Sequence, residues 1–232
     1  SRRGFLKSAA AIGFPTIIPS YVLGQDPNVT PPSNRVNMGI IGTGGRGKHL
    51  MHMHIGPTRD AQFLAVCDVD DKHGAAAKRV ADSRHESDDC KNYTDYSLML
   101  HEMEDVQAVI VATPDHWHAL ASIAAAKAGK DVYCEKPLVN SIGEGIAVEK
   151  AMKENIRILQ CGSHERSHPN ARFAAEIVRN GHIGELKRMV VNLPTDQAHH
   201  KKIKESAAMP PKQEVPEWFD YDLLLGHTPI VQ

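Results

Sequence analysis

A glycine-rich turn after a short apolar run is the feature that most constrains how this chain can fold. Residues 36–41 read Val-Asn-Met-Gly-Ile-Ile, and residues 42–47 read Gly-Thr-Gly-Gly-Arg-Gly. The pattern Gly-x-Gly-x-x-Gly between a strand and a helix is typical of a turn that binds a dinucleotide. Gly42 permits the tight turn, Gly44 lets a pyrophosphate approach the backbone, and Gly47 lets helix and strand pack closely.

The turn would supply hydrogen-bond donors as well as space. A helix predicted over 48–55 has its N-terminus at the turn, where free N–H groups and the positive end of the helix dipole attract phosphate. We therefore expect the cofactor to contact the six loop residues Gly42, Thr43, Gly44, Gly45, Arg46 and Gly47. Glycine-rich turns are common, so this prediction depends on what the rest of the chain provides.

A carboxylate after the next predicted strand provides a second part of such a site. Residues 62–67 read as a strand, and Asp68 follows about 20 residues after Gly47, where this fold places an acid on the adenosine ribose hydroxyls. A carboxylate there would repel the 2′-phosphate of NADP, so NAD is favoured, although nearby Lys72 argues the other way. Asp68 could instead cap a helix predicted over 71–81, and both roles are compatible.

Strand and helix patterns alternate along the following stretch of the chain. Further strands are predicted over residues 93–96, 106–112, 131–134 and 157–161, and further helices over residues 97–103, 116–128 and 142–155. The continuous apolar run at 106–112 is typical of a parallel strand that is covered on both faces. We therefore predict an α/β fold whose N-terminal part is a Rossmann-type, doubly wound parallel sheet.

The residues with unusual chemistry all follow predicted strands. Ligands of a doubly wound sheet bind outside the carboxyl ends of the strands. The glycine turn, Asp68, Thr-Pro-Asp-His-Trp-His at 113–118 and Glu-Lys-Pro at 135–137 all fall at that edge. We expect a single ligand site there.

Composition excludes several other classes of protein. The chain is 41% hydrophobic and 24% charged with a net charge of −1, and it has no basic block that would favour nucleic acid. Its four cysteines match no zinc spacing and indicate no disulfide framework. His116 and His118 could ligate a metal, but no acidic or cysteine ligands accompany them at a usable spacing, so we expect no metal site.

The N-terminus carries the pattern of an export signal. Arg2-Arg3 precedes Phe5-Leu6-Lys7 and a moderately apolar stretch at 9–23, which resembles a bacterial twin-arginine signal. We expect residues 1–34 to be signal and linker, with cleavage near Gly24-Gln25 and a periplasmic mature protein. The twin-arginine machinery would then be a partner, and its transport of folded proteins would allow a cofactor to be loaded before export.

Two segments at the predicted sheet edge resemble a known family. Val-Ala-Thr-Pro-Asp-His-Trp-His-Ala at 111–119 and Asp-Val-Tyr-Cys-Glu-Lys-Pro-Leu at 131–138 are similar to the Gfo/Idh/MocA oxidoreductases, the group of glucose–fructose oxidoreductase and inositol dehydrogenase. The resemblance covers residues 35 to about 192 and implies a Rossmann domain that binds NAD or NADP, here 35–158. It also implies a second α/β domain with an open sheet, here beginning at 159.

The same resemblance implies roles for individual residues. Lys136 would be the catalytic residue, since the lysine of Glu-Lys-Pro lies beside nicotinamide and substrate in the family. A lysine that is shielded from water there could have a pKa low enough for proton transfer. Pro137 would set the turn after the strand and could follow a cis bond. The residues placed near the cofactor by this resemblance and by the sheet edge are Thr113, Pro114, His116, His118, Glu135 and Lys136.

The C-terminal part looks incomplete against the family pattern. A helix over 170–180 and a strand over 186–193 would begin the second domain, and a short apolar cluster lies at 218–225. The Asp-x-x-x-His element that supplies a catalytic His in the family has no visible counterpart. We therefore expect residues 159–232 to be the truncated start of that domain. A fragment of a longer protein is favoured over a truncated gene product, and the full-length form could be a homo-oligomer.

Three functions remain open from the sequence. The first is an NAD(P)-dependent oxidoreductase that moves a hydride between nicotinamide and a sugar or polyol. The second is a glycosidase of the same fold, which uses a tightly held NAD and gives no net redox change. The third is a non-catalytic nucleotide-binding fragment.

Overall fold

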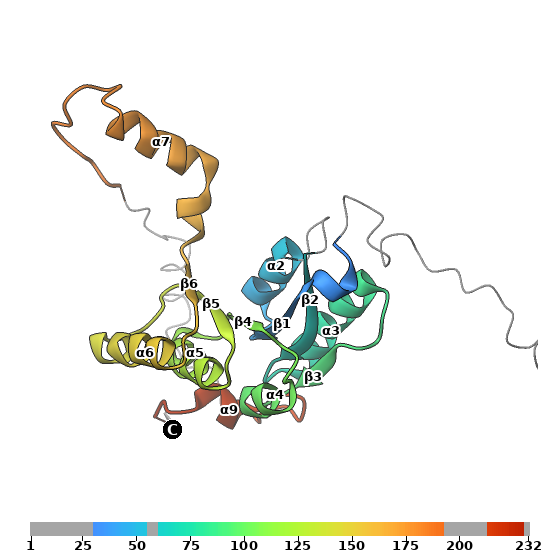
Figure 1. Cartoon of the computed structure of the whole chain (residues 1–232). Coiled ribbons are helices and arrows are strands. Elements are labelled where there is room, and N and C mark those ends of the chain that lie inside the picture. The colour runs from blue at the N-terminus through green and yellow to red at the C-terminus, as the bar shows by residue number, and fades with distance from the viewer. Residues whose placement is uncertain (1–29, 55–59, 193–212, 230–232) are drawn as a thin grey trace, which may run out of the picture.

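The computed structural model describes residues 30–54, 60–192 and 213–229, and its centre is one parallel sheet. Six strands occur in the order β3-β2-β1-β4-β5-β6 (Figure 1). Their bounds are β1 Val36–Ile41, β2 Ala61–Cys67, β3 Lys91–Tyr93, β4 Ala108–Val111, β5 Asp131–Glu135 and β6 Leu159–Gly162. This order is that of the Rossmann fold, so the predicted doubly wound sheet is confirmed.

Helices cover both faces of the sheet. They are α2 Gly45–His54, α3 Asp71–His85, α4 Tyr96–Glu102, α5 His118–Lys127 and α6 Ile142–Glu154. One apolar cluster contains Leu50 of α2 and Ala77 of α3, and the other contains Met99 of α4 and Met152 of α6. Because side chains alternate along each strand, the central strand β1 contributes Ile40 to the first cluster and neighbouring Ile41 to the second.

The direction of the chain reverses beside β1. From β1 the chain builds outward through β2 to β3, and it then returns to place β4 on the other side of β1. The crevice between β1 and β4 is the switch point at which doubly wound sheets bind their ligands. The glycine turn follows β1, and 113–118 follows β4, so the fold brings these two motifs to one crevice.

The cap of α3 differs from the sequence-based alternative. Asp70, not Asp68, is the N-cap, and its carboxylate accepts hydrogen bonds from the N–H groups of Lys72 and His73. Asp68 lies two residues before the N-cap position. It is too far from the helix for that role, because an N-cap side chain reaches only the second and third N–H groups of its helix. Asp68 is therefore available to the glycine turn.

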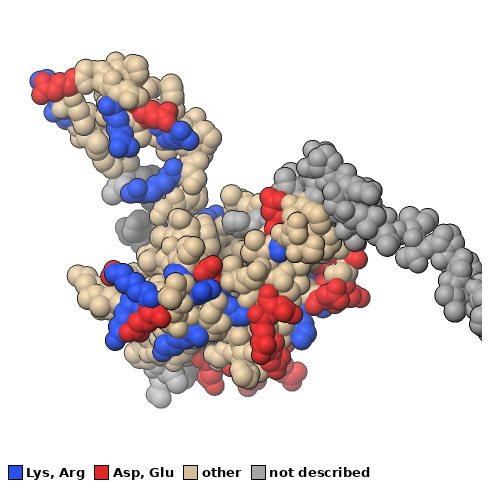
Figure 2. Space-filling view, in the orientation of Figure 1, with Lys and Arg blue, Asp and Glu red and all other residues tan. Residues whose placement is uncertain are grey.

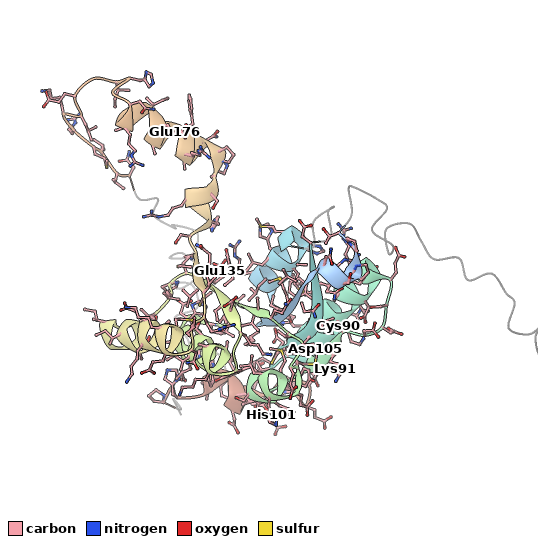
Figure 3. All side chains as sticks on the ribbon, viewed as in Figure 1. Cys90, Lys91, His101, Asp105, Glu135 and Glu176 are labelled. Atoms are coloured by element: carbon pink, nitrogen blue, oxygen red, sulfur yellow. The ribbon has the colours of Figure 1, made fainter. Side chains whose placement is uncertain are left out.

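The expected boundary of the Rossmann unit at 158 is too early. β6 pairs in parallel with β5 from Val132↔Leu159 to Glu135↔Gly162, so the sheet extends to Gly162. Beyond it come η3 His164–Ser167 and α7 Pro169–Arg179, which confirms the helix predicted over 170–180. In Figures 1 and 3, α7 and its side chains, including Glu176, project away from the sheet.

The strand predicted over 186–193 is not formed in its described part. Residues 186–192 have no strand assignment, and Met189, Val190 and Val191 are exposed. A single strand gains stability only from a paired neighbour and a buried face, and the described residues give this segment neither. Residue 193 lies outside the described residues.

A short C-terminal segment returns to the Rossmann sheet. η1 Pro32–Asn34 precedes β1 at one end of the described chain, and α9 Tyr221–Leu225 lies near the other end. The backbone of Phe219 forms an antiparallel bridge with Asp70, directly after β2. This segment belongs to the range 159–232 that the sequence assigned to the second domain, yet it packs on the first.

Two further observations concern surface and membrane. Basic and acidic side chains are interspersed over the face in Figure 2. Among the described residues, no helix is long and apolar enough to span a bilayer. The predicted export signal, apart from residues 30–34 of its linker, lies outside the described residues.

Candidate functional site

The glycine turn is held by close backbone contacts. Gly42 has a φ of 87°, and a Cβ there would lie 2.6 Å from the carbonyl oxygen of Ala112. A Cβ on Gly47 would overlap the carbonyl oxygen of Gly42. A Cβ on Gly44 or Gly45 would have no atom within 4 Å. Gly42 and Gly47 therefore serve the protein's own packing, whereas Gly44 and Gly45 leave open space at the start of α2.

Asp68 fixes this turn from the end of β2. Its Oδ2 accepts hydrogen bonds from the Thr43 N–H at 2.6 Å and the Thr43 hydroxyl at 2.9 Å, and its Oδ1 accepts from the Asp70 N–H at 2.9 Å. Thr43 is fully buried, so it supports the loop from within. The amides that face a phosphate are then those at the start of α2, where helix geometry leaves the first N–H groups without an intrahelical acceptor.

A cavity of about 350 Å³ lies at this edge of the sheet. It is bounded by the glycine turn, by the residues after β2, β3 and β4, by α9 and by Phe219. Seven of the predicted site residues line it: Gly42, Gly44, Gly45, Arg46, Asp68, Thr113 and Pro114. The structure thus brings together three motifs that are separated by 70 residues of sequence.

Three carboxylates lie on the β2–β3 side of the cavity. Asp68, Asp70 and Asp95 line it there. Lys72, the one lysine that argued for NADP, places its Nζ 3.5 Å from the centroid of the Trp218 ring. A 2′-phosphate would meet carboxylates on this side, so the arrangement favours NAD.

Two other cavity residues are held in their neutral forms. Burial, with Asp68 and Asp95 nearby, raises the pKa of the Cys67 thiol far above its ordinary value. Burial also raises the pKa of the Tyr96 phenol. Cys67 is thus an apolar wall of the cavity and not a nucleophile, while Tyr96 keeps its proton as a hydrogen-bond donor.

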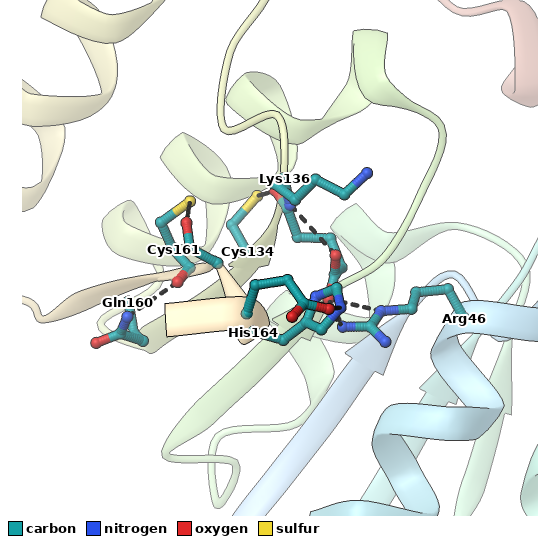
Figure 4. A network of polar contacts seen from close by, with 9 residues as sticks. Arg46, Cys134, Lys136, Gln160, Cys161 and His164 are labelled. Carbon is teal, nitrogen blue, oxygen red and sulfur yellow. Dashed lines mark hydrogen bonds and ion pairs between the residues drawn. The ribbon is translucent and has the colours of Figure 1, made fainter. Parts of the chain in front are cut away.

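An ion pair connects the glycine turn to Glu-Lys-Pro. Arg46 Nη2 lies 2.6 Å from Glu135 Oε1, and Arg46 Nε donates to the same oxygen at 2.7 Å (Figure 4). Glu135 Oε2 accepts from the Lys136 N–H at 3.3 Å, and Arg46 also approaches His164 Nδ1 at 3.5 Å. Glu135 is buried and does not line the cavity; it orients the strand end that carries Lys136.

Lys136 itself lies outside the cavity. Its side chain is exposed, and no dashed line reaches its amine in Figure 4. The Lys136–Pro137 peptide bond is cis, as anticipated from the sequence. The described residues therefore do not shield the Lys136 side chain from water.

The two predicted histidines support backbone rather than line the cavity. His118 is 1% exposed, and its Nδ1 and Nε2 lie 2.6 Å and 2.9 Å from the carbonyl oxygens of Pro137 and Thr113. It ties the turns after β4 and β5 to each other, and a ligand cannot reach its ring. The His116 Nε2 lies 2.9 Å from the carbonyl oxygen of Leu224, in the C-terminal segment.

The described part of the chain contains no group of three metal-ligating side chains. His116 forms ring contacts instead: its neighbours are the aromatic rings of Trp117 and His227. The histidines near the cavity therefore serve packing and hydrogen bonding in this structure.

Sequence reasoning missed two groups of cavity residues. Asp95 and Tyr96 follow β3, so the rule that ligands meet strand ends would have found them. Phe219, Leu223 and Leu224 carry no such signal, because a short apolar cluster far along the chain does not show which surface it covers.

Comparison with known proteins agrees with this geometry. The sequence model of the GFO_IDH_MocA oxidoreductase family, described as having an NAD-binding Rossmann fold, matches residues 36–163. An inositol 2-dehydrogenase of Serratia proteamaculans is 34% identical over 151 residues, which are 65% of this chain and 43% of that protein. A 2,7-anhydro-N-acetylneuraminate hydratase of Mediterraneibacter gnavus is 31% identical over 151 residues, 65% of this chain and 37% of that protein.

Solved structures give the same fold. The crystal structure of myo-inositol 2-dehydrogenase from Lactobacillus plantarum superposes with a TM-score of 0.59 at 28% identity, covering 66% of this chain and 43% of that one. The chain therefore spans less than half of the length of the relatives that it matches.

Proposed function

We propose, from the premise that this chain belongs to the Gfo/Idh/MocA oxidoreductase family, that the protein transfers a hydride between NAD and a CH–OH group of a polyol or sugar. The observation that carries the proposal is the cavity that joins the glycine turn, Asp68 and Thr113-Pro114 at the switch point of the sheet. The relatives named as inositol dehydrogenases favour a cyclic polyol as the substrate class.

The residues present fit a dinucleotide. Side chains at Gly44 and Gly45 would fill open space beside the start of α2, which is where a pyrophosphate would approach. Asp68 lies at the end of β2, where an acid meets the adenosine ribose, and the neighbouring carboxylates disfavour NADP. Bound NAD would supply the hydride acceptor.

The chain's own residues would then position the substrate and handle the proton of its hydroxyl group. Arg46 and Glu135 hold the end of β5 against the glycine turn. Lys136, at that end, would meet the substrate hydroxyl and hold or move its proton. Its exposure in this structure means that substrate, nicotinamide or the second domain would have to shield it from water.

One observation favours a second function. A relative of comparable similarity is named a hydratase, a name that denotes addition of water. A glycosidase or related enzyme that retains its NAD would fit the same site. The third alternative is a nucleotide-binding protein without catalysis. It would bind its ligand in the cavity, and Lys136 would have no catalytic role.

The experiment is to titrate the protein with NAD and NADP, and then to follow NADH formation with myo-inositol and other polyols. We expect NAD to bind more tightly than NADP and NADH to appear with a polyol. Lys136→Met should lower kcat by roughly a hundredfold or more at unchanged NAD affinity, because it removes a proton-transfer group. Lys127→Met, an exposed lysine at the end of α5, is the matched control and should leave both unchanged.

The outcomes separate the alternatives. NAD binding without NADH formation, together with cleavage of a glycoside or anhydro-sugar, would establish the redox-neutral function. Binding without any turnover would leave only the nucleotide-binding one. Failure of the protein to bind either NAD or NADP would refute all three.

We also propose that residues 1–34 direct export by the twin-arginine route. The support is the pair Arg2-Arg3, the following Phe5-Leu6-Lys7 and the short apolar stretch. The test fuses these residues to a reporter and compares the periplasmic fraction with that of an Arg2→Lys/Arg3→Lys variant. Equal export of both would contradict the proposal.

A further inference from the structure

Residues 216–228, called the strap below, lie across the mouth of the cofactor crevice. The strap contains α9 and approaches the sheet from a part of the chain more than 50 residues beyond β6. Three of its side chains, Phe219, Leu223 and Leu224, line the 350 Å³ cavity. It is therefore a wall of the candidate site and not only a neighbour of it.

The strap is anchored on one side of the crevice at the start of α3. The Asp71 N–H donates to the carbonyl oxygen of Trp218 at 3.0 Å, and the Asp220 N–H donates to that of Val69 at 2.8 Å. The Trp218 ring also lies under the Lys72 ammonium. A cation over a tryptophan face adds attraction to these two hydrogen bonds.

The second anchor lies on the other side, after β4. The carbonyl oxygen of Leu224 accepts a hydrogen bond from Trp117 Nε1 at 2.9 Å and lies 2.9 Å from His116 Nε2. His227 packs edge-on against the ring of Trp117, with centroids 5.8 Å apart. The strap thus joins the residues after β2 to those after β4 and crosses the switch point between them.

The covered half is the adenosine half. The acid that meets the adenosine ribose in this fold lies at the end of β2, and Asp68 is there. A volume near 350 Å³ is at the low end of ligand pockets, which suits one nucleoside better than a whole dinucleotide. The apolar side chains Phe219, Leu223 and Leu224 offer the surface that a purine ring would contact.

We propose that the strap closes over the adenosine moiety of the bound dinucleotide and slows its release, so that the cofactor stays with the enzyme between turnovers. This inference rests on the proposed binding of NAD. Its physical basis is that a ligand under a segment anchored at both ends must wait for an anchor to open. Tight retention would serve either function considered above, and a redox-neutral one most.

Gly226 gives a variant that displaces the strap from a position that does not itself line the cavity. It has a φ of 54°, and a Cβ there would overlap the indole ring of Trp117. Gly226→Ala should therefore displace the second anchor. Leu223→Ala tests the wall directly, and Leu225→Ala is its matched control, because Leu225 is equally half-buried in α9 but does not line the cavity.

The experiment measures NADH release by stopped-flow and equilibrium binding of 5′-AMP and of nicotinamide mononucleotide. Leu223→Ala should release NADH about tenfold faster, as expected for the loss of a few buried methylene groups. Gly226→Ala should have an effect of similar size, because it displaces the second anchor. Both substitutions should weaken the binding of 5′-AMP by the same factor and leave the affinity for nicotinamide mononucleotide unchanged. Leu225→Ala should match the unmodified protein in all three.

Several outcomes would overturn the proposal. Unchanged release in Gly226→Ala and Leu223→Ala would show that the strap does not hold the cofactor, and equal weakening of both mononucleotides would show a general loosening. The variants should remain folded, because neither buried apolar cluster contains a strap residue; thermal melting checks this. Absence of NADH binding in the unmodified protein would refute the proposed function itself and is thus a distinct result.

Discussion

The two halves of the sheet's carboxyl edge differ in how far they are enclosed. After β1, β2 and β3, the glycine turn, Asp68 and the strap surround a cavity, and Cys67 at its wall is 2% exposed. After β5 and β6, Lys136 is exposed and Cys161 is partly exposed. One half is an enclosed cavity, whereas the other presents the Lys136 side chain to solvent.

This difference shows which part of the chemistry the described residues supply by themselves. The residues proposed to bind the cofactor all lie within the Rossmann unit and its strap. Proton transfer by Lys136 depends on a desolvated surrounding, which these residues do not provide. The ion pair between Arg46 and Glu135 is a direct link between the halves.

The largest contrast between the two halves should appear in thiol reactivity. Burial raises the pKa of Cys90 and of Cys134 to about 12 and that of Cys67 higher still, so little thiolate forms at neutral pH. A thiol reagent should modify Cys161 at least about a hundredfold faster than the other three, which react only after local opening.

The measurement is the time course of thiol modification, with all four groups counted after unfolding. Cys161→Ser should remove the fast phase. Fast modification of Cys67, the cysteine that lines the cavity, would mean that the first half is less enclosed than the structure shows.

Gly47→Ala should break the enclosed half. A methyl group would overlap the Gly42 carbonyl oxygen and push α2 away from β1. We expect a loss of about 1 to 3 kcal/mol in the free energy of unfolding, typical of overpacking, and at least tenfold weaker NAD binding. Denaturant unfolding and NAD titration measure the two effects.

Its control is Gly143→Ala in α6, where the nearest atom to a new Cβ is 3.9 Å away. That substitution should stabilise slightly, because alanine favours helix more than glycine does. Similar losses in both variants would contradict the assigned role of Gly47.

Arg46→Met should uncouple the two halves with a smaller effect. It leaves the Glu135 carboxylate, whose side chain is 6% exposed, without its cationic partner. We expect a loss of about 1 to 2 kcal/mol, and Arg46→Met/Glu135→Gln should recover at least half of it, because an unpaired buried charge costs more than a neutral amide.

The smallest effect on stability is expected from an exposed ion pair, which serves as the comparison for Arg46–Glu135. Lys153 and Glu149 form an exposed i,i+4 ion pair on α6, and Lys153→Met should leave the unfolding midpoint unchanged. If Arg46→Met also left the free energy of unfolding unchanged, the ion pair between Arg46 and Glu135 would not stabilise the contact between the two halves.

Local patterns in the sequence determined the Rossmann sheet, its helices and the glycine turn. They did so because each depends on short-range signals: apolar runs of four to seven residues, a glycine spacing and the turn residues that separate them. The same patterns identified Asp68 and Thr113-Pro114, since parallel strands place their carboxyl ends at one edge. Their prediction at the cavity agrees with the structure.

Only the tertiary structure decided which faces these residues meet. The motif after β4 predicted His118 beside the cofactor. In the structure, each of its ring nitrogens instead lies within hydrogen-bond distance of a carbonyl oxygen, one in the turn after β4 and one in the turn after β5. Leu223 and Leu224 read as an unassigned apolar cluster, and their burial against a site formed some 110 to 180 residues earlier is a long-range contact that no local period encodes. Secondary structure follows from neighbours along the chain, whereas the wall of this cavity follows from which distant surfaces come together.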